Sequence, residues 1–365
     1  MKNTFGQSVS VTLFGESHGE AIGAVLDGIA PGIKIDEARI ADSLARRRPS
    51  SSIDTARRES DRYSIISGVF NGCTTGTPIA VIIPNEDKKS TDYSQFRTVA
   101  RPSHADYAAQ LKYHGYQDYR GGGHFSGRVT AALVAVGAIA ATALELKGIK
   151  IATHIKTCGT VCDRGFEDVA KDIEALSKSA FPVLSDCEEA MRTVIEKAKS
   201  NLDSVGGVTE TVILGMPGGV GEPWFDSVES VLSHAIFSLG GIKGIEFGDG
   251  FGLASMFGSE ANDAFAVKDG EIVTETNRNG GINGGITNGM PILFRCAVKP
   301  TPSISAKQKT VDFAEKKETE LEIKGRHDPA IIRRICPVID SVCALAVCDM
   351  LASRFGTDYF TKKDI

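Results

Sequence analysis

The stretch "SVSVTLFGESHGEAIGAVLDG", from Ser8 to Gly28, contains two segments in which polar and apolar residues alternate, separated by a glycine-containing turn. A period of two is typical of a half-buried β-strand, and two such segments around a short turn predict a hairpin. Strand patterns recur further along the chain. They cover residues 63–70, 78–84, 149–161, 208–215 and 291–300.

Helical patterns lie separately from these strands. They cover residues 36–49, 104–115, 129–146, 167–177, 187–199, 226–239 and 329–355. Asp36 is the expected N-cap of the first helix and Pro49 its stop, and Pro337 is expected to interrupt the last. Strands in hairpins and separately placed helices predict an α+β fold, not a doubly wound parallel sheet. No Pro- or Ser-rich linker divides the chain, which favours one domain over residues 1–365 with two pseudo-similar halves.

Composition excludes several classes of function. The 365 residues carry a net charge of −5, so nothing favours nucleic acid or an anionic membrane as a partner. The N-terminus lacks the apolar core of a signal peptide, and the run from Val129 to Gly148 is interrupted by glycine, as in a buried core helix. Eight cysteines without a C-x-x-C pair indicate reduced thiols in a cytoplasmic protein.

The turn of the first hairpin, "GESHG", matches the G-x-S-x-G nucleophile elbow of serine hydrolases, with Ser17 as nucleophile. An elbow needs a helix after the serine, whereas this sequence continues as a strand. The hydrolase is therefore the weaker hypothesis. Ser17 and His18 at a strand end could instead hydrogen-bond an anionic substrate.

Six arginines fall between Arg46 and Arg62, interleaved with acids. Such a run is often a solvated helix end. Arginine also binds carboxylate and phosphate bidentately, and a triplet followed by Pro49 and hydroxyl residues could clamp an anion. The sequence leaves both interpretations open.

Two more clusters of residues could bind an anion or transfer a proton. Gly121–Gly123 precede an apolar helix, whose first backbone N–H groups could bind phosphate. Arg326, His327 and Asp328 place a cation, an imidazole and a carboxylate side by side, which suits proton transfer. His154, Cys158 and Cys162 could suggest zinc, but on a strand they would lie about 13 Å apart, so no metal is expected.

Together these stretches resemble the chorismate synthase family. The matching motifs occur in order along nearly the whole chain: "NTFGQSVSVTLFGESHGEAIG", "RRRP", "SGVFNGCTTGTPI", "RPSHADY", "DYRGGG", "GGVGEP", "KGIEFGDGF", "GGINGGITNG", "KPTPS" and "KGRHDP". Residues 165–199 match least.

The resemblance implies a β-α-β sandwich of antiparallel sheets around a helical layer, and a homotetramer. It implies a lyase of the shikimate pathway that converts 5-enolpyruvylshikimate 3-phosphate to chorismate by an anti 1,4-elimination. The reaction depends on reduced FMN, which some members obtain with NADPH. The remaining alternative is a flavin-binding protein without activity.

The matching motifs assign the roles of the family's residues to residues of this chain. The resemblance implies that His18 protonates the departing phosphate, that His104 supplies a proton at the flavin, and that Asp328 relays a proton from it. Ser17 and Ser126 would support that relay. Substrate anions would bind His18, Arg47, Arg48 and Arg128. The cofactor would contact Arg47, His104, His124, Phe125, Ser126, Gly240, Gly241, Gly284, Lys299, Pro300, Thr301, Pro302, Ser303 and Arg326.

Three departures from the family pattern concern these contacts. The family usually has "GGGRSSAR" where this chain has "GGGHFSGR", so His124 and Phe125 replace an arginine and a serine. Ile53 stands where the family often has an arginine. Gly240-Gly241 replace a common Asn-Ala pair, so only backbone contacts to the cofactor are expected there.

Overall fold

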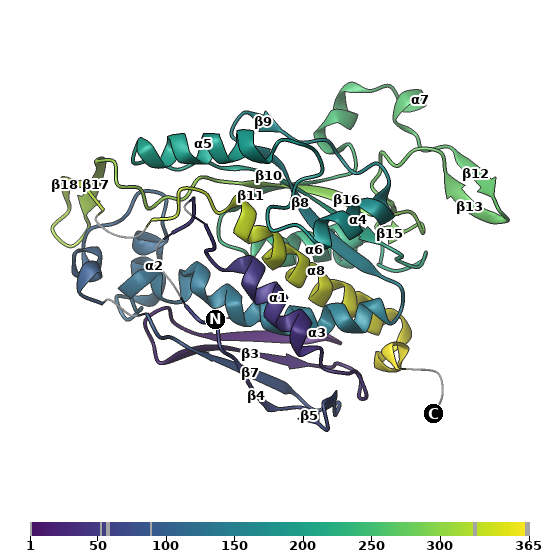
Figure 1. The fold of residues 1–365 in the computed structure, drawn as a ribbon, viewed down its shortest axis with the longest axis horizontal. Helices are drawn as coiled ribbons and strands as arrows, with labels where there is room; N and C mark the ends of the chain where they lie inside the picture. The colour runs from purple at the N-terminus through teal and green to yellow at the C-terminus, as the bar shows by residue number, and fades with distance from the viewer. Residues whose placement is uncertain (1, 52, 56–58, 88–89, 324–326, 362–365) are drawn as a thin grey trace.

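The computed structural model describes residues 2–51, 53–55, 59–87, 90–323 and 327–361. Two five-stranded antiparallel sheets enclose a layer of helices, as the resemblance implied (Figure 1). A single cluster of buried apolar side chains runs through this layer from one sheet to the other. The predicted α+β class is confirmed.

The N-terminal residues build the first sheet. Its order is β1 (Thr4–Phe5), β2 (Ser10–Gly15), β3 (Ala21–Asp27), β7 (Ile79–Pro84) and β4 (Ser64–Ser67). The predicted hairpin is β2–β3, with Val11 opposite Leu26. Along β3 the apolar side chains of Ile22, Ala24 and Leu26 are fully buried, so one face of the sheet packs on the helices.

The second sheet is built from strands between Lys150 and Val298. Its order is β11 (Ile242–Phe247), β16 (Ile292–Val298), β10 (Gly207–Leu214), β8 (Lys150–Cys158) and β9 (Val161–Cys162). The sequence patterns predicted β8, β10 and β16 but missed β11. Gly244 interrupts the alternation of β11, at the point where its pairing with β16 shifts register.

Four helices fill the space between the sheets: α1 (Glu37–Arg47), α3 (Thr130–Glu145), α6 (Val228–Phe237) and α8 (Ile332–Phe355). Helices α4 (Val169–Ser177) and α5 (Glu188–Ser200) cover the outer face of the second sheet. The predicted cap of α1 is confirmed, because the Asp36 carboxylate accepts a hydrogen bond from Arg39 N. Two helices, Gly127–Glu145 and Ile332–Phe355, are long and apolar enough to cross a membrane, but they are 78% and 94% buried in the core.

The expected interruption at Pro337 is wrong, because α8 continues without a break from Ile332 to Phe355. Pro337 is the sixth residue of the helix, so it removes only the bond to the carbonyl of Arg333 near the helix start. Its own carbonyl accepts a bond from Ser341 Oγ at 2.7 Å. Burial of nearly every residue of α8 outweighs the lost bond.

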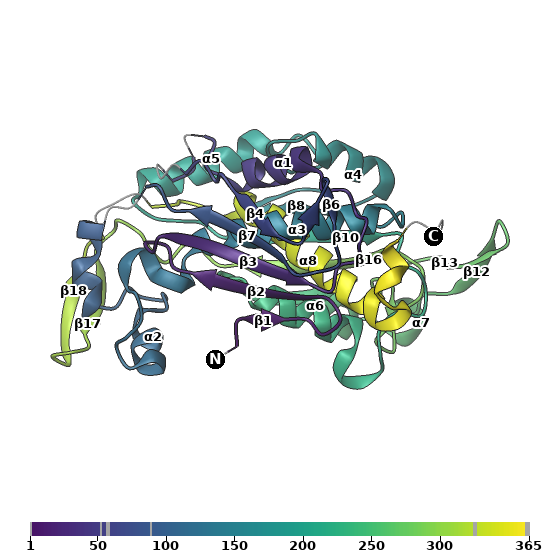
Figure 2. The same cartoon turned by 90° about the horizontal axis from the view of Figure 1, so that it is seen from below.

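Short elements extend from the two ends of the sandwich. They are β5–β6 (Val69–Phe70, Cys73–Thr74), β12–β13 (Phe265–Lys268, Glu271–Thr274), β14–β15 (Ile282–Asn283, Ile286–Thr287), β17–β18 (Gln308–Asp312, Lys317–Leu321), α2 (Asp106–Tyr113) and α7 (Gly258–Ala261). Hairpin β17–β18 lies at the same end as α2, and β12–β13 projects from the opposite end (Figures 1 and 2).

Candidate active site

Three helix ends meet at the end of the sandwich that carries α2. The side chain of Arg47, the last residue of α1, donates to Gly127 O (3.3 Å) just before α3 begins. Arg334 in the first turn of α8 donates to Arg47 O (2.8 Å). The N-termini of α3 and α8 therefore converge here, and the positive ends of the two helix dipoles favour anions.

The triple glycine holds the two predicted catalytic histidines together. Gly121, Gly122 and Gly123 all have positive φ, at 57°, 84° and 54°. A Cβ at Gly121 would lie 2.4 Å from His18 Nδ1, and one at Gly122 would lie 3.4 Å from His104 Nε2. Only glycine fits both the backbone conformation and the space. The turn therefore contacts both histidines, His18 at Gly121 and His104 at Gly122.

Backbone contacts fasten the His18 loop to this turn. Ser17 N donates to Gly123 O at 3.0 Å, and His124 Nδ1 lies 2.8 Å from Gly15 O. His124, the first residue of the family departure, therefore bonds to the backbone of the His18 loop. The His18 ring packs edge-on against Tyr93, with ring centroids 4.9 Å apart.

Asn85 holds the His18 loop by hydrogen bonds to its backbone, and Arg128 in turn bonds to Asn85. Asn85 Nδ2 donates to Glu16 O (2.9 Å) and Gly19 O (3.1 Å), and Arg128 Nε donates to Asn85 Oδ1 (2.9 Å). The sequence analysis missed Asn85. It follows the strand 78–84 directly, but nothing in the sequence connects it to residues 16–19.

The predicted anion-binding arginines are bonded inside the protein. Arg47 and Arg128 both pair with the fully buried carboxylate of Asp61, which the sequence analysis also missed. Burial lowers the pKa of Arg47 to about 10, with Asp61 opposing the shift. Arg47 Nε is buried and has no hydrogen-bond partner among the described residues. Arg48 donates to Ser60 O (2.8 Å) and lines a hollow of about 1260 Å³ between α1 and the segment around Tyr63.

The segment from Lys299 to Ser303 lies beside His104. Lys299 Nζ donates to Ser103 O (2.7 Å), and Lys299 N donates to Gly241 O (2.9 Å). Ser303 Oγ lies 3.4 Å from a guanidinium nitrogen of Arg101. The predicted cofactor residues of this segment and Gly241 are therefore brought to His104.

Two features of this segment suit an anionic ligand. Burial and the neighbouring Lys243 lower the pKa of Lys299, so positive charge gathers there, and no carboxylate among the described residues forms an ion pair with Lys299. Thr301 Oγ1 is buried and makes no hydrogen bond within the described part of the chain. A buried hydroxyl without a partner is costly unless a ligand or water binds it.

Asp328 precedes α8 and is largely buried. Its Oδ2 pairs with Arg334, and its Oδ1 has no partner in the described segments. Burial raises the pKa of the Asp328 carboxyl above its ordinary value and Asp54 adds to this, against the opposing charge of Arg334. A carboxyl with a raised pKa holds a proton more readily than an ordinary aspartate, which suits a relay.

The remaining predicted residues have other surroundings. Phe125 packs edge-on against Tyr113 at 6.0 Å, and Ser126 Oγ accepts a bond from Arg128 N (3.3 Å). Gly284 lies in the turn between β14 and β15, far from α2 in Figure 1. Arg326 lies outside the described residues. Ile53 is packed into the hydrophobic core, 2% exposed.

The serine-hydrolase elbow is not formed. Ser17 follows β2, but the chain continues into the antiparallel strand β3 instead of a helix. His154, from the sequence that could suggest zinc, is bonded to Asp163 and Glu210 on the second sheet.

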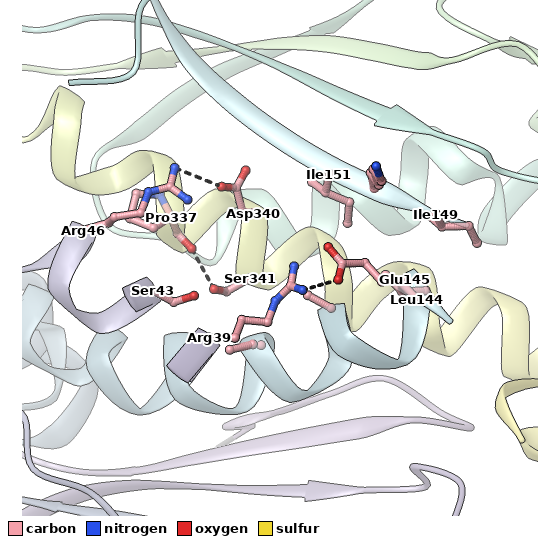
Figure 3. Close-up of a pocket in the computed structure, with 14 residues that line it drawn as sticks. Arg39, Ser43, Arg46, Leu144, Glu145, Ile149, Ile151, Pro337, Asp340 and Ser341 are labelled. Carbon is pink, nitrogen blue, oxygen red and sulfur yellow. Dashed lines mark hydrogen bonds and ion pairs between the residues drawn. The ribbon is translucent and has the colours of Figure 1, made fainter. Parts of the chain in front are cut away.

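A separate cavity of about 70 Å³ lies between α1, α3, α8 and the start of β8 (Figure 3). Arg46 points toward Asp340, and Arg39 pairs with Glu145 at its rim. None of the described residues predicted for the site lines it.

The sequence profile of the chorismate synthase family matches residues 9–352. The chain is similar to chorismate synthase from Pyrococcus abyssi, at 46% identity over 96% of this chain and 97% of that protein. Chorismate synthase from Thermococcus kodakarensis is 45% identical over the same shares. A crystal structure of chorismate synthase superposes with a TM-score of 0.75 at 29% identity, covering 96% of this chain and 94% of the other.

Proposed function

The chain belongs to the chorismate synthase family, and on this premise we propose which of its residues carry the family's reaction. That reaction is the anti 1,4-elimination of phosphate and a ring proton from 5-enolpyruvylshikimate 3-phosphate, which gives chorismate in the shikimate pathway. The enzyme is a lyase with a small-molecule substrate. The family needs a reduced flavin, although the elimination causes no net redox change.

We propose that reduced FMN binds between His104, the glycine turn and residues 299–303. The unbonded Thr301 hydroxyl and the uncompensated charge of Lys299 support this, because both suit a polar, anionic group. When bound, the reduced flavin supplies electron density to the substrate ring and accepts the ring proton. The backbone at Gly122 leaves space for a close approach beside His104.

We propose that His18 faces the phosphate that leaves. The N-terminal end of α3 and the guanidinium groups of Arg47, Arg48 and Arg128 make this end of the sandwich positive. Asp61 offsets part of that charge. Protonation by His18 would neutralise part of the charge on the leaving phosphate, while the cations hold it in position.

His104 and Asp328 would handle protons on the cofactor side. His104, beside Gly122 of the glycine turn, would supply a proton to the cofactor. Asp328, with its raised pKa, would take up and pass on a proton on the cofactor side. Ser17 and Ser126 are placed on the loop and turn between these groups and would support the transfer.

One observation carries the proposal: adjacent residues of a single glycine turn, Gly121 and Gly122, pack against His18 and His104. The test is an anaerobic assay with 5-enolpyruvylshikimate 3-phosphate and dithionite-reduced FMN, following chorismate absorbance and phosphate release. We expect His104→Ala to lower kcat by about 10²- to 10⁴-fold, the usual contribution of a general acid. The control is His114→Asn, because His114 is exposed at the end of α2 with φ 55° and asparagine tolerates that conformation.

The outcomes separate the alternatives. Full activity in His104→Ala would overturn the assigned role of His104. FMN binding without product in the wild type would favour a flavin-binding protein without activity. Labelling of Ser17 by a fluorophosphonate would favour the hydrolase. Replacing dithionite by NADPH tests whether this chain reduces FMN itself.

We further propose a cytoplasmic homotetramer in which residues 1–365 form one domain. The core cluster that runs through both sheets supports the single domain. Sedimentation velocity of the purified chain measures the assembly, and a monomer at micromolar concentration would contradict it.

A further inference from the structure

Asp106, two residues after His104, is the most heavily bonded carboxylate near the glycine turn. It accepts hydrogen bonds from Arg101 N (2.9 Å), Arg101 Nε (2.8 Å) and Arg101 Nη2 (2.7 Å). Its Oδ1 also lies 2.8 Å from His104 Nδ1. One carboxylate thus contacts both the loop before His104 and the imidazole itself.

The charge of Asp106 determines which group donates in the hydrogen bond between Asp106 and His104. Burial alone would raise the pKa of this carboxyl, but the hydrogen bonds from Arg101 and His104 outweigh burial and hold the pKa well below its ordinary range. An ionised carboxylate only accepts hydrogen bonds. Arg101 Nη2 also lies 3.0 Å from His104 Nδ1, but it is closer to Asp106 Oδ1. An unprotonated Nδ1 would set two acceptors against each other at the 2.8 Å between His104 Nδ1 and Asp106 Oδ1, so this contact favours a proton on Nδ1 that is donated in a hydrogen bond to Asp106.

The other ring nitrogen of His104, Nε2, then lies toward the glycine turn. A Cβ on Gly122 would lie 3.3 Å from His104 Cε1 and 3.4 Å from Nε2, so this edge of the ring lies against the glycine turn. With the Nδ1 proton held by Asp106, only Nε2 can exchange a proton with a group at the turn.

We propose that Asp106 is a positioning residue for the reaction: it fixes His104 as the Nδ1–H tautomer, so that Nε2 exchanges the proton. The inference rests on the role given to His104 under the proposed function. Arg101 extends the arrangement to the cofactor segment, because its Nη1 lies 3.4 Å from Ser303 Oγ. Other charged or titratable groups facing this cluster are Lys299, bonded to Ser103 O, and His327, whose pKa is lowered by burial and by Arg101.

A purely structural role would have different consequences. Asp106 also holds Ser103, whose φ is 59°, within a turn closed by the bond to Arg101 N. In Asp106→Asn the amide oxygen can take the place of Oδ2 and keep the bonds from Arg101 N and Nε. The NH₂ group then takes the place of Oδ1, loses the bond from Arg101 Nη2 and faces His104. That NH₂ group donates, so it would turn His104 Nδ1 into an acceptor and move the proton to Nε2.

The first test is a long-range ¹H–¹⁵N NMR spectrum of the flavin-free protein labelled with ¹⁵N-histidine. The His104 signal is assigned as the one lost in His104→Gln. We expect the neutral form to carry its proton on Nδ1 in the wild type and on Nε2 in Asp106→Asn. The matched control is Asp172→Asn, since Asp172 also binds an arginine through both oxygens and accepts a backbone bond, from Glu167 N. An unchanged tautomer in Asp106→Asn overturns the proposal.

The second test is steady-state kinetics with reduced FMN. We expect Asp106→Asn to lower kcat by about 10- to 100-fold while KM for the substrate stays within about twofold, the sign of an interaction made in the transition state. In a His104→Ala background the same change should cost nothing further, since the two residues act as a unit. An equal loss in both backgrounds would show that Asp106 acts independently of His104.

These outcomes separate the two proposals. Loss of activity in His104→Ala with full activity in Asp106→Asn overturns only the role of Asp106, whereas full activity in His104→Ala overturns the assigned function of His104. If Asp106→Asn does not fold, Arg101→Lys retains the carboxylate. Its His104 must keep the Nδ1 proton, and a moved proton there also overturns the proposal.

Discussion

His104 and His154 each lie beside an aspartate, but the two regions differ in how completely their polar groups are bonded. His154 is fully buried on β8, with Nδ1 3.1 Å from Asp163 and Nε2 3.1 Å from Glu210. Asp163 accepts further bonds from Leu184 N, Ser185 Oγ and Arg164 N. Every nitrogen of His154 thus has a partner, and nothing is left for a ligand.

The region around His104 contains polar atoms without partners. Thr301 Oγ1, Asp328 Oδ1 and Arg47 Nε are buried and unbonded among the described residues. Buried polar groups are normally satisfied, so these three atoms are candidates for contacts with a ligand. Thr209 Oγ1, beside Glu210 on β10, is also buried without a partner among the described residues. The difference in hydrogen bonding therefore separates the two histidines and their immediate partners, and not the whole scaffold from the site.

The largest expected effect tests the scaffold. His154→Leu leaves two buried carboxylates without their partner, which typically costs about 3–5 kcal/mol of unfolding free energy. Urea denaturation measures this loss. Because His154 lies away from the glycine turn, activity per folded molecule should stay within about twofold. Lost activity with unchanged stability would instead place His154 in the active site and contradict its assignment to the scaffold.

The same cluster predicts a pH dependence. Burial lowers the pKa of His154, but hydrogen bonds and charge from Asp163 and Glu210 outweigh burial and raise it overall. A raised folded pKa gives stability that is complete below the unfolded value of about 6.5 and is lost as pH rises through the folded pKa. Wild-type unfolding free energy should therefore fall above that pH, and His154→Leu should lack this decline. The same pH dependence of the unfolding free energy in the wild type and in His154→Leu would contradict this prediction.

Asp340 is one of several buried polar groups outside the predicted site that have an unbonded atom among the described residues. Its Oδ1 is unbonded among the described residues although it lies in the cavity of Figure 3, outside the predicted site. Burial raises its pKa to about 6, against the charge of Arg46. The folded state therefore binds this proton more tightly, and stability falls as pH rises from the unfolded pKa of about 4 to 6, by at most about 3 kcal/mol. Asp340→Asn should remove that fall in denaturation curves, without an effect on kcat.

The smallest expected effect tests the site. Thr301→Val removes a hydroxyl that bonds to nothing in the described chain, so the unfolding free energy of the flavin-free protein should stay within about 0.5 kcal/mol. Binding of reduced FMN should weaken by about 1 kcal/mol, roughly fivefold, as measured by anaerobic titration. The control is Thr153→Val, because Thr153 Oγ1 is bonded to Thr211 at 2.9 Å. That variant should lose stability and keep its FMN affinity.

Much of the fold could be predicted from local patterns. The β2–β3 hairpin, the Asp36 cap and the apolar helix α3 follow from period and capping chemistry, which act over a few residues. The patterns missed β11 because a glycine shifts its register, and they overestimated Pro337 because burial of α8 outweighs one lost hydrogen bond. The arginine run left two interpretations open. In the structure Arg47 is buried against Asp61, while Arg48 is partly exposed along a hollow.

The ordered set of motifs was enough to identify the family and the reaction, and it predicts the two histidines, because all of these depend on residue types at fixed places in the motifs. Which groups meet follows only from the tertiary fold. Asn85 reaches the His18 loop, Asp61 joins Arg47 to Arg128, and the glycine turn contacts His18 at Gly121 and His104 at Gly122. These contacts join residues that are distant in the chain, so they depend on how the two sheets close around α1, α3 and α8.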